Sequence, residues 1–237
     1  MNKSIVVLGS GRSGTSFLSN LLHSNGVYAG HCTPGTLESV KVREINEAFL
    51  AKHYQGKTRS KTPYGILPDD EIKVEEEFQI HAKKYIEDMS SSGGQWWDNS
   101  TSWWMMKDPR SILVHDMWVK HFDVIIGVIR NPIEVANSYV ELLGVYYPDN
   151  KEEAFDVMLN YWKRFNKSLL HVFKNSDKEK YLLDFNGDVE KQTKNLFRNL
   201  GINLVNFTYD KNKKHQNSTD GEDIEIYNKL KDIRNLI

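Results

Sequence analysis

The chain has 237 residues, of which 39% are hydrophobic and 27% are charged, and its formal net charge is −1. This length and composition suit a single α/β domain, residues 1–237, with a core large enough to need no metal or disulfide. The near-zero charge argues against a general nucleic-acid binder, which usually carries a basic excess, so we expect no nucleic-acid partner.

Short apolar runs predict the strands, and helical periodicity between them predicts the helices. The first run, at residues 4–8, has no polar alternation, as expected of a strand that is covered on both faces. The predicted elements that follow, in chain order, are a glycine-rich loop at 9–15, a helix at 15–24, a short strand at 27–29, a helix at 39–54, a loop at 55–70, a helix at 71–89, a Ser/Gly-rich stretch at 90–102, a strand at 103–106, a helix at 111–120, a strand at 124–129, a helix at 132–143, a long helix at 152–173, a strand at 181–183, a helix at 189–200, a polar loop at 210–221 and a last short helix.

This alternation of strands and helices predicts the fold class. Consecutive strand–helix–strand units form parallel sheets with right-handed crossovers and helices on both faces. We therefore expect an α/β fold of three layers, in which a central, mainly parallel sheet is flanked by helices.

The segment G-S-G-R-S-G-T-S, at residues 9–16, has the features of a phosphate-binding loop. Its three glycines permit positive φ and close backbone approach, and the helix that follows offers unpaired N–H groups and about half a positive charge. A plain strand-to-helix turn would need only one glycine. The groups that we expect to bind a phosphate here are Gly11, Arg12, Ser13, Gly14, Thr15 and Ser16.

The type of phosphate ligand depends on Thr15. The spacing from Gly9 to Gly14 is that of the nucleoside triphosphate loop G-x-x-x-x-G-K-[ST], but Thr15 stands where that loop has lysine. The missing lysine removes a contact to the β- and γ-phosphates. The sequence therefore disfavours an ATPase, GTPase or nucleotide kinase.

A second anion-binding element is predicted at Arg130. This residue follows the predicted strand at 124–129, at the end where open α/β sheets bind ligands. Asn131 and Pro132 then begin a helix, with Asn131 placed to cap it, and Ser138 lies about two turns further on. The alternative is an ordinary strand–helix junction with a surface arginine.

The two elements together resemble the PAPS-dependent sulfotransferase superfamily, where PAPS is 3′-phosphoadenosine 5′-phosphosulfate. G-R-S-G-T-S resembles the superfamily's 5′-phosphosulfate loop, and R-N-P-x-x-x-x-x-S-Y, from Arg130 to Tyr139, resembles its 3′-phosphate motif. The chain is more similar to bacterial and carbohydrate-type members than to the cytosolic aryl and steroid type. The resemblance implies a P-loop-NTPase-like fold and in-line transfer of a sulfuryl group from PAPS to a hydroxyl or amine, with release of PAP.

The resemblance also implies catalytic roles. Arg12 stands where many cytosolic members have lysine, and it would stabilise the leaving phosphate. Glu38 matches the position of the acceptor-side base in some branches, and Lys107 would contact the sulfuryl oxygens. Asp108 is an alternative base, or else a structural cap that pairs with Arg110 or a backbone N–H.

The same resemblance implies further residues that surround the cofactor. Tyr181 is the candidate aromatic beside the adenine, and Lys213, Lys214 and His215 are candidates for a final contact to the 3′-phosphate. We expect no metal, because cations can replace magnesium and the sequence shows no ligand cluster. Residues 55–102 would include a helical and loop insertion that forms a flap over the acceptor.

The expected partner is a small-molecule or carbohydrate acceptor. No signal peptide is recognisable, and no run reaches the roughly 18 apolar residues of a membrane span, so we expect a cytoplasmic protein without a membrane partner. Two alternatives stay open: a P-loop nucleotide kinase or NTPase, and a catalytically inactive nucleotide-binding protein of the same fold.

Overall fold

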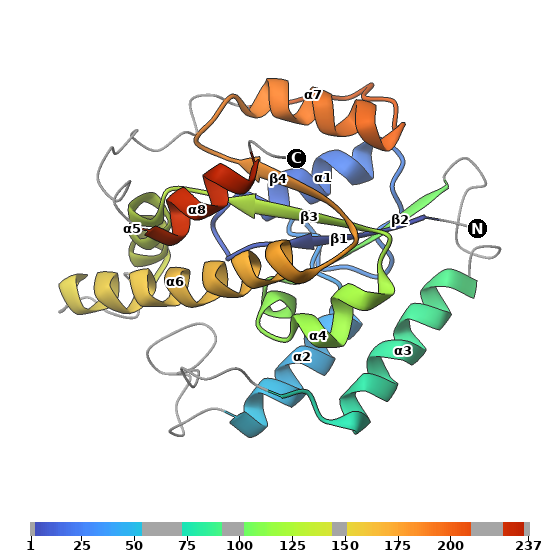
Figure 1. Cartoon of the computed structure of the whole chain (residues 1–237), viewed down its shortest axis with the longest axis horizontal. Helices are drawn as coiled ribbons and strands as arrows, with labels where there is room; N and C mark the ends of the chain where they lie inside the picture. Colours follow the sequence, from blue (N-terminus) through green and yellow to red (C-terminus); the bar gives the residue numbers. More distant parts are fainter. Residues whose placement is uncertain (1–2, 54–72, 92–101, 144–150, 210–224, 235–237) are drawn as a thin grey trace.

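The computed structural model describes residues 3–53, 73–91, 102–143, 151–209 and 225–234. Within these residues, a four-stranded sheet has the order β2-β1-β3-β4, and every neighbouring pair is parallel (Figure 1). The strands are β1 (Lys3–Leu8), β2 (Trp103–Lys107), β3 (Val124–Ile129) and β4 (Glu179–Asp184).

Helices cover both faces of this sheet, which makes three layers. Figure 1 shows α1 and α7 on one face and the other helices on the opposite face. The helices are α1 (Thr15–Ser24), α2 (Val40–His53), α3 (Glu76–Ser91), the 3₁₀ turn η1 (Pro109–Ile112), α4 (His115–Trp118), the 3₁₀ turn η2 (Val119–His121), α5 (Pro132–Leu143), α6 (Lys151–Asn175), α7 (Val189–Leu200) and α8 (Glu225–Arg234).

Each face of the sheet contributes to its own apolar core. Alternate residues of β2 separate in this way: Trp104 and Met106 join the core under α2–α6 and α8, while Trp103 and Met105 join the core under α1 and α7. A strand with two buried faces has no polar face to show. This explains why the strands appear in the sequence as unbroken apolar runs.

The order of the strands places the ligand-binding crevice. The chain leaves β1 for β2 on one side and then returns past β1 to β3 and β4 on the other side. Loops that leave β1 and β3 therefore diverge at the carboxyl edge of the sheet, where open α/β sheets bind ligands. The segments after these two strands begin at Gly9 and Arg130.

The predicted α/β class and its parallel, three-layer arrangement are confirmed. Four elements have the predicted bounds: α1, β3, α5 and α7. Residues 27–29 form only a single bridge, between Tyr28 and Trp104, and the predicted helix at 71–89 begins at Glu76. The predicted loops at 55–70 and 210–221 lie outside the described residues.

The prediction of a single helix at 111–120 was wrong. Asp108 accepts a hydrogen bond from the backbone N–H of Arg110, which begins a 3₁₀ turn at Pro109, earlier than expected. Val114 then leaves the helical region, with φ −125° and ψ 37°, and α4 begins anew at His115. A side-chain cap at the start and one residue outside the helical region thus leave short helical pieces in place of one helix.

The helical part of the predicted flap is joined to the main core. Phe78 of α3 packs edge-to-face on Phe49 of α2, with ring centroids 5.0 Å apart.

Among the described residues, no helix combines the length and apolar character needed to cross a bilayer.

Gly127 tests the packing between the sheet and α6. A Cβ atom added there would lie 2.7 Å from Leu182 Cδ1 and 2.8 Å from Phe173 Cε2. Overpacking of this kind costs about 1–3 kcal/mol. We expect Gly127→Ala to lower the free energy of unfolding by that amount in urea titrations. An unchanged value would show that this layer has room for a methyl group.

Candidate phosphate-binding and catalytic site

The loop after β1 has a backbone that only certain residues can adopt. Gly14 has φ 103°, and a Cβ there would lie 2.4 Å from the ring of Phe185. A Cβ on Gly9 would lie 2.5 Å from the carbonyl oxygen of Val128, so the loop passes directly over the end of β3. Arg12 takes φ 64°, a left-handed conformation that costs a non-glycine residue about 1–2 kcal/mol.

This loop delivers the N-terminus of α1 without a side-chain cap. Gly14 is the cap residue, and it has no side chain that could bond to the first turn. The first N–H groups of a helix have no partner within the helix, and uncapped they suit an anion. The Ser13 hydroxyl donates to the carbonyl oxygen of Ser10 at 2.5 Å, so it bonds within the loop in this structure.

Ser10 is a residue that the sequence did not single out. It is 1% exposed, and its hydroxyl has no hydrogen-bond partner in the described part of the chain. A buried hydroxyl without a partner is costly, which suggests a ligand contact. Its place between Gly9 and Gly11 in the loop is the signal that could have identified it.

The two predicted anion-binding elements meet in the structure. Arg12 Nε donates to Ser138 Oγ at 2.9 Å, although 126 residues separate them. Arg130 Nη1 lies 3.4 Å from the backbone carbonyl oxygen of Arg12. The loop after β1 and the helix after β3 thus form one positively charged site at the carboxyl edge of the sheet.

Arg130 is held in a fixed orientation. Its Nε donates to Glu134 at 2.8 Å, and the two side chains are 9% and 5% exposed. Asn186 donates to the other oxygen of Glu134 at 2.8 Å and accepts from the backbone N–H of Asn131. Asn131 in turn caps α5, as predicted, by accepting from the N–H of Ile133 at 2.9 Å. The described contacts of Arg130 use Nε and Nη1, which leaves Nη2 for an anion.

Aromatic side chains surround this charged site. Phe185 follows β4 directly and lies 5.9 Å from the Arg130 guanidinium, measured from ring centroid to Cζ. Tyr209 packs edge-to-face on Phe185 and on Phe17. Burial raises the pKa of Tyr209, and its hydroxyl has no hydrogen-bond partner among the described residues. The site therefore has an aromatic wall with one unused hydroxyl.

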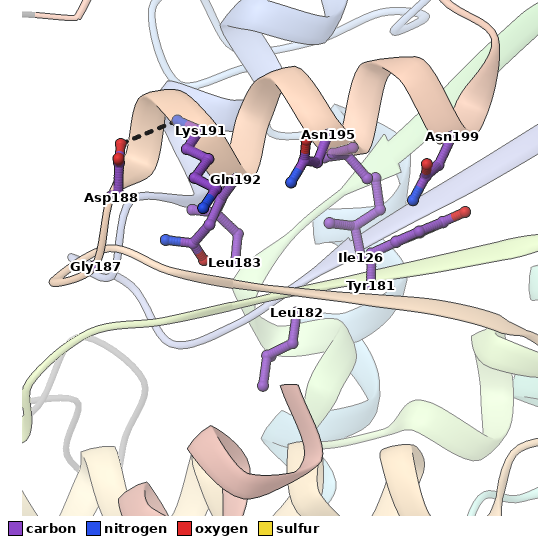
Figure 2. A pocket seen from close by; sticks show the side chains of 11 residues that line it. Ile126, Tyr181, Leu182, Leu183, Gly187, Asp188, Lys191, Gln192, Asn195 and Asn199 are labelled. Atoms are coloured by element: carbon purple, nitrogen blue, oxygen red, sulfur yellow. Dashed lines mark hydrogen bonds between the residues drawn. The ribbon is translucent and has the colours of Figure 1, made fainter. Parts of the chain in front are cut away.

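The sequence did not predict this aromatic wall. Phe185 directly follows β4, just as Gly9 follows β1 and Arg130 follows β3. This position at the carboxyl end of a strand could have identified Phe185 as a site residue. Tyr181, the candidate that was chosen instead, lies in the body of β4 (Figure 2). Its hydroxyl donates to Glu179 at 2.5 Å, and burial raises its pKa to about 12. The structure does not bring Tyr181 to the phosphate loop.

Lys107 connects the phosphate loop to the predicted acceptor side. It ends β2, is 2% exposed, and its Nζ contacts Ser16 Oγ at 3.1 Å and Glu38 Oε1 at 3.2 Å. A third bond, at 3.2 Å, goes to the carbonyl oxygen of Thr36. Burial lowers the pKa of Lys107, while the Glu38 carboxylate acts in the opposite direction.

Glu38 is positioned by a strained turn. Leu37 has φ 51°, and its N–H donates to the carbonyl oxygen of Thr33 at 3.0 Å. The N–H of Thr33 donates to the carbonyl oxygen of Glu38 at 2.8 Å, which closes the turn. The Glu38 side chain is 20% exposed, so a molecule arriving from solvent can reach it.

Asp108 has the geometry of the structural cap that the sequence left as an alternative. Its Oδ1 accepts from the backbone N–H of Arg110 at 2.9 Å and from Asn46 Nδ2 at 3.2 Å, while Oδ2 accepts from the Arg110 guanidinium at 2.7 Å. The residue is 0% exposed, and burial raises its pKa. Both oxygens are occupied and hidden from solvent.

The structure thus brings together most of the predicted site. Lys213, Lys214 and His215 lie outside the described residues. Within the described ranges, no group of three or more His, Cys, Asp or Glu side chains could hold a metal ion.

Lys107 provides a test of the electrostatics of this site. Because its folded-state pKa lies below the ordinary 10.5, the unfolded chain binds more protons between the two values. The stability of the wild type therefore rises with pH in that window. We expect the free energy of unfolding of the wild type to rise relative to that of Lys107→Met as the pH increases toward 10.5. Urea titrations across the pH range would measure this, and a constant difference would contradict it.

Comparison with known proteins agrees with this arrangement. The model of the sulfotransferase family matches residues 4–206. A search of curated proteins finds no match. The matched span contains the phosphate loop, the Arg130 element and all four strands of the described sheet except Lys3, the first residue of β1. The chain therefore belongs to the sulfotransferase family.

Proposed function

We propose that the protein transfers a sulfuryl group from PAPS to a hydroxyl or amine of an acceptor and releases PAP. The observation that carries this proposal is the 2.9 Å contact between Arg12 and Ser138, which joins two anion-binding elements in one site. A nucleotide with phosphates at both its 5′ and 3′ positions needs two such elements close together. A nucleoside triphosphate would instead need the lysine that Thr15 replaces.

The described residues fit this donor. The uncapped N–H groups of α1 would hold the 5′-phosphate, with Ser10 supplying its unused hydroxyl. Arg130 and Ser138 would hold the 3′-phosphate, because Glu134 fixes the guanidinium and leaves Nη2 available. Phe185 would face the adenine, and the Tyr209 hydroxyl would find a polar partner on the nucleotide.

The donor supplies an activated sulfuryl group, and the protein supplies position and charge. Transfer through a loose, in-line transition state depends more on these two than on covalent catalysis. Arg12 and the α1 N-terminus would stabilise charge on the leaving phosphate oxygen as its bond to sulfur breaks. Lys107, which contacts Ser16 of the phosphate loop, would stabilise the sulfuryl oxygens. Arginine stays protonated, so Arg12 acts here as a fixed cation.

Glu38 is the better candidate for the base. It would accept the proton of the acceptor hydroxyl or amine while the oxygen or nitrogen forms its bond to sulfur. Glu38 is partly exposed and lies beside Lys107, whereas Asp108 is fully buried and holds Arg110. We propose that Asp108 positions Arg110, which lies 3.9 Å from Glu38, and that residues 55–102 contribute the acceptor flap.

Thermal stability with added nucleotides tests the choice of donor. PAP at about a hundred times its dissociation constant should add about 2.7 kcal/mol of stability. For a chain of this size, that is a rise of about 5–10 °C in melting temperature. Arg130→Ala should lose most of this shift, while Arg198→Ala, an exposed arginine on α7, should keep it. Stabilisation by ATP or GTP but not by PAP would contradict the proposal.

Paired carboxylate variants test the assignment of the base. Glu38→Gln should lower the turnover rate about 10²–10⁴-fold, and it should also lower stability because the buried Lys107 loses its charged partner. Asp108→Asn should lose about 1–3 kcal/mol of stability but retain most of the rate. PAP release would be measured with the best acceptor from a panel of alcohols, phenols, sugars and amines. Full activity of Glu38→Gln would exclude Glu38 as the base.

A further inference from the structure

A groove of about 510 Å³ lies between β4 and α7, apart from the phosphate loop (Figure 2). Its floor includes Leu182 and Leu183 of β4. Its upper wall is polar and comes from α7, whose Gln192, Asn195 and Asn199 side chains line it. The proposed reaction uses none of these residues, so the groove needs a separate explanation.

The strand beside this groove is an edge of the sheet. In the described sheet, β4 pairs only with β3. The N–H of Phe185, the residue after β4, donates to the carbonyl oxygen of Ile129 at 2.8 Å, so it points toward β3. Successive residues of a strand direct their peptide groups to opposite sides. The peptide groups of Asp184, Leu182 and Lys180 therefore point away from the sheet.

Gln192 occupies one of these outward positions in the way that a neighbouring strand would. Its Oε1 accepts from the backbone N–H of Asp184 at 2.9 Å, and its Nε2 donates to the carbonyl oxygen of the same residue at 3.0 Å. One side-chain amide thus satisfies both halves of a peptide group. The outward peptide groups of Leu182 and Lys180 have no such partner among the described residues, although Leu182 is only 7% exposed.

The spacing of the polar wall matches an extended chain. Lys191, Asn195 and Asn199 are four residues apart on α7, which corresponds to a rise of about 6 Å per step. An extended peptide repeats every two residues, or about 6.6 Å. Helix α7 runs along β4 in Figure 2, so the ammonium group of Lys191 and the amides of Asn195 and Asn199 would each meet one repeat of a peptide lying on the strand edge.

We propose that this groove binds an extended peptide segment of a partner protein, which adds to β4 as a further strand. The free peptide groups of Leu182 and Lys180 would supply the backbone hydrogen bonds, and Asn195 and Asn199 would bond to the opposite edge of the peptide. Native proteins usually block a strand edge with proline, a bulge or a covering element. Here, Asp184 is the one outward position with a partner among the described residues, and the rest would form a recognition surface of the strand-addition type.

Random dodecapeptides displayed on phage would serve as the probe. They would be selected against the immobilised full chain, and an enriched peptide would be synthesised for fluorescence anisotropy. We expect the double variant Asn195→Ala, Asn199→Ala to weaken binding about tenfold. Lys194→Ala, on the exposed face of the same helix, should bind as the wild type does. PAP should not displace the peptide, which separates this site from the proposed donor site.

Backbone methylation of the peptide would establish the binding mode. N-methylation at alternate residues should abolish binding, because their N–H groups face β4. Methylation at the intervening residues, whose N–H groups face Asn195 and Asn199, should weaken binding only about tenfold, as the double variant does. Failure to enrich a peptide, displacement by PAP, or a methylation pattern without this two-residue period would overturn the proposal. So would a concentration-dependent dimer that Asn195→Arg disperses, since the groove would then bind a second copy of the chain.

Discussion

The site depends on one constraint, which is that six residues must turn the chain from the end of β1 into α1 without capping the helix. The left-handed conformations of Arg12 and Gly14 make this turn possible, and the ring of Phe185 packs against it at Gly14. The consequence is a set of helix N–H groups that the cap residue leaves without a side-chain partner. Other charged groups reach this position from strand ends: Lys107 from β2 and Arg130 from β3. The parallel sheet makes this convergence possible, because the carboxyl ends of all its strands lie at one edge.

Buried charge is the cost of this arrangement. Lys107, Asp108 and Arg130 are buried, and each has an oppositely charged partner. Buried ion pairs of this kind seldom add stability, and apolar residues of similar shape often replace them without loss. The presence of these ion pairs is better explained by where they hold their charged groups. Each pair fixes a charged group at a place where the proposed reaction needs it, and the apolar cores on both faces of the sheet supply the stability.

Much of this could be predicted from the sequence, and the rest could not for physical reasons. Unbroken apolar runs, with glycine and proline at their ends, correctly predicted the bounds of the strand at 124–129 and of the helices at 15–24 and 132–143. The contact of Arg12 with Ser138 follows from strand order, which local patterns do not contain. The early helical start before residues 111–120 depends on the Asp108 side chain, which caps the turn at the N–H of Arg110. The aromatic wall depends on packing between segments that are distant in the sequence. Phe185 could have been found from its place after a strand, whereas Tyr209 could not.

The central claim is that one site recognises both phosphates of a 3′,5′-bisphosphorylated nucleotide. A thermodynamic cycle tests this most directly: the affinities of PAP and of 5′-AMP, which lacks the 3′-phosphate, measured by calorimetry for the wild type and for Arg130→Ala. The account predicts that the wild type prefers PAP by about 10–100-fold, the value of a charged hydrogen-bonded contact, and that Arg130→Ala loses this preference. An equal preference in both proteins, or no preference in the wild type, would contradict it.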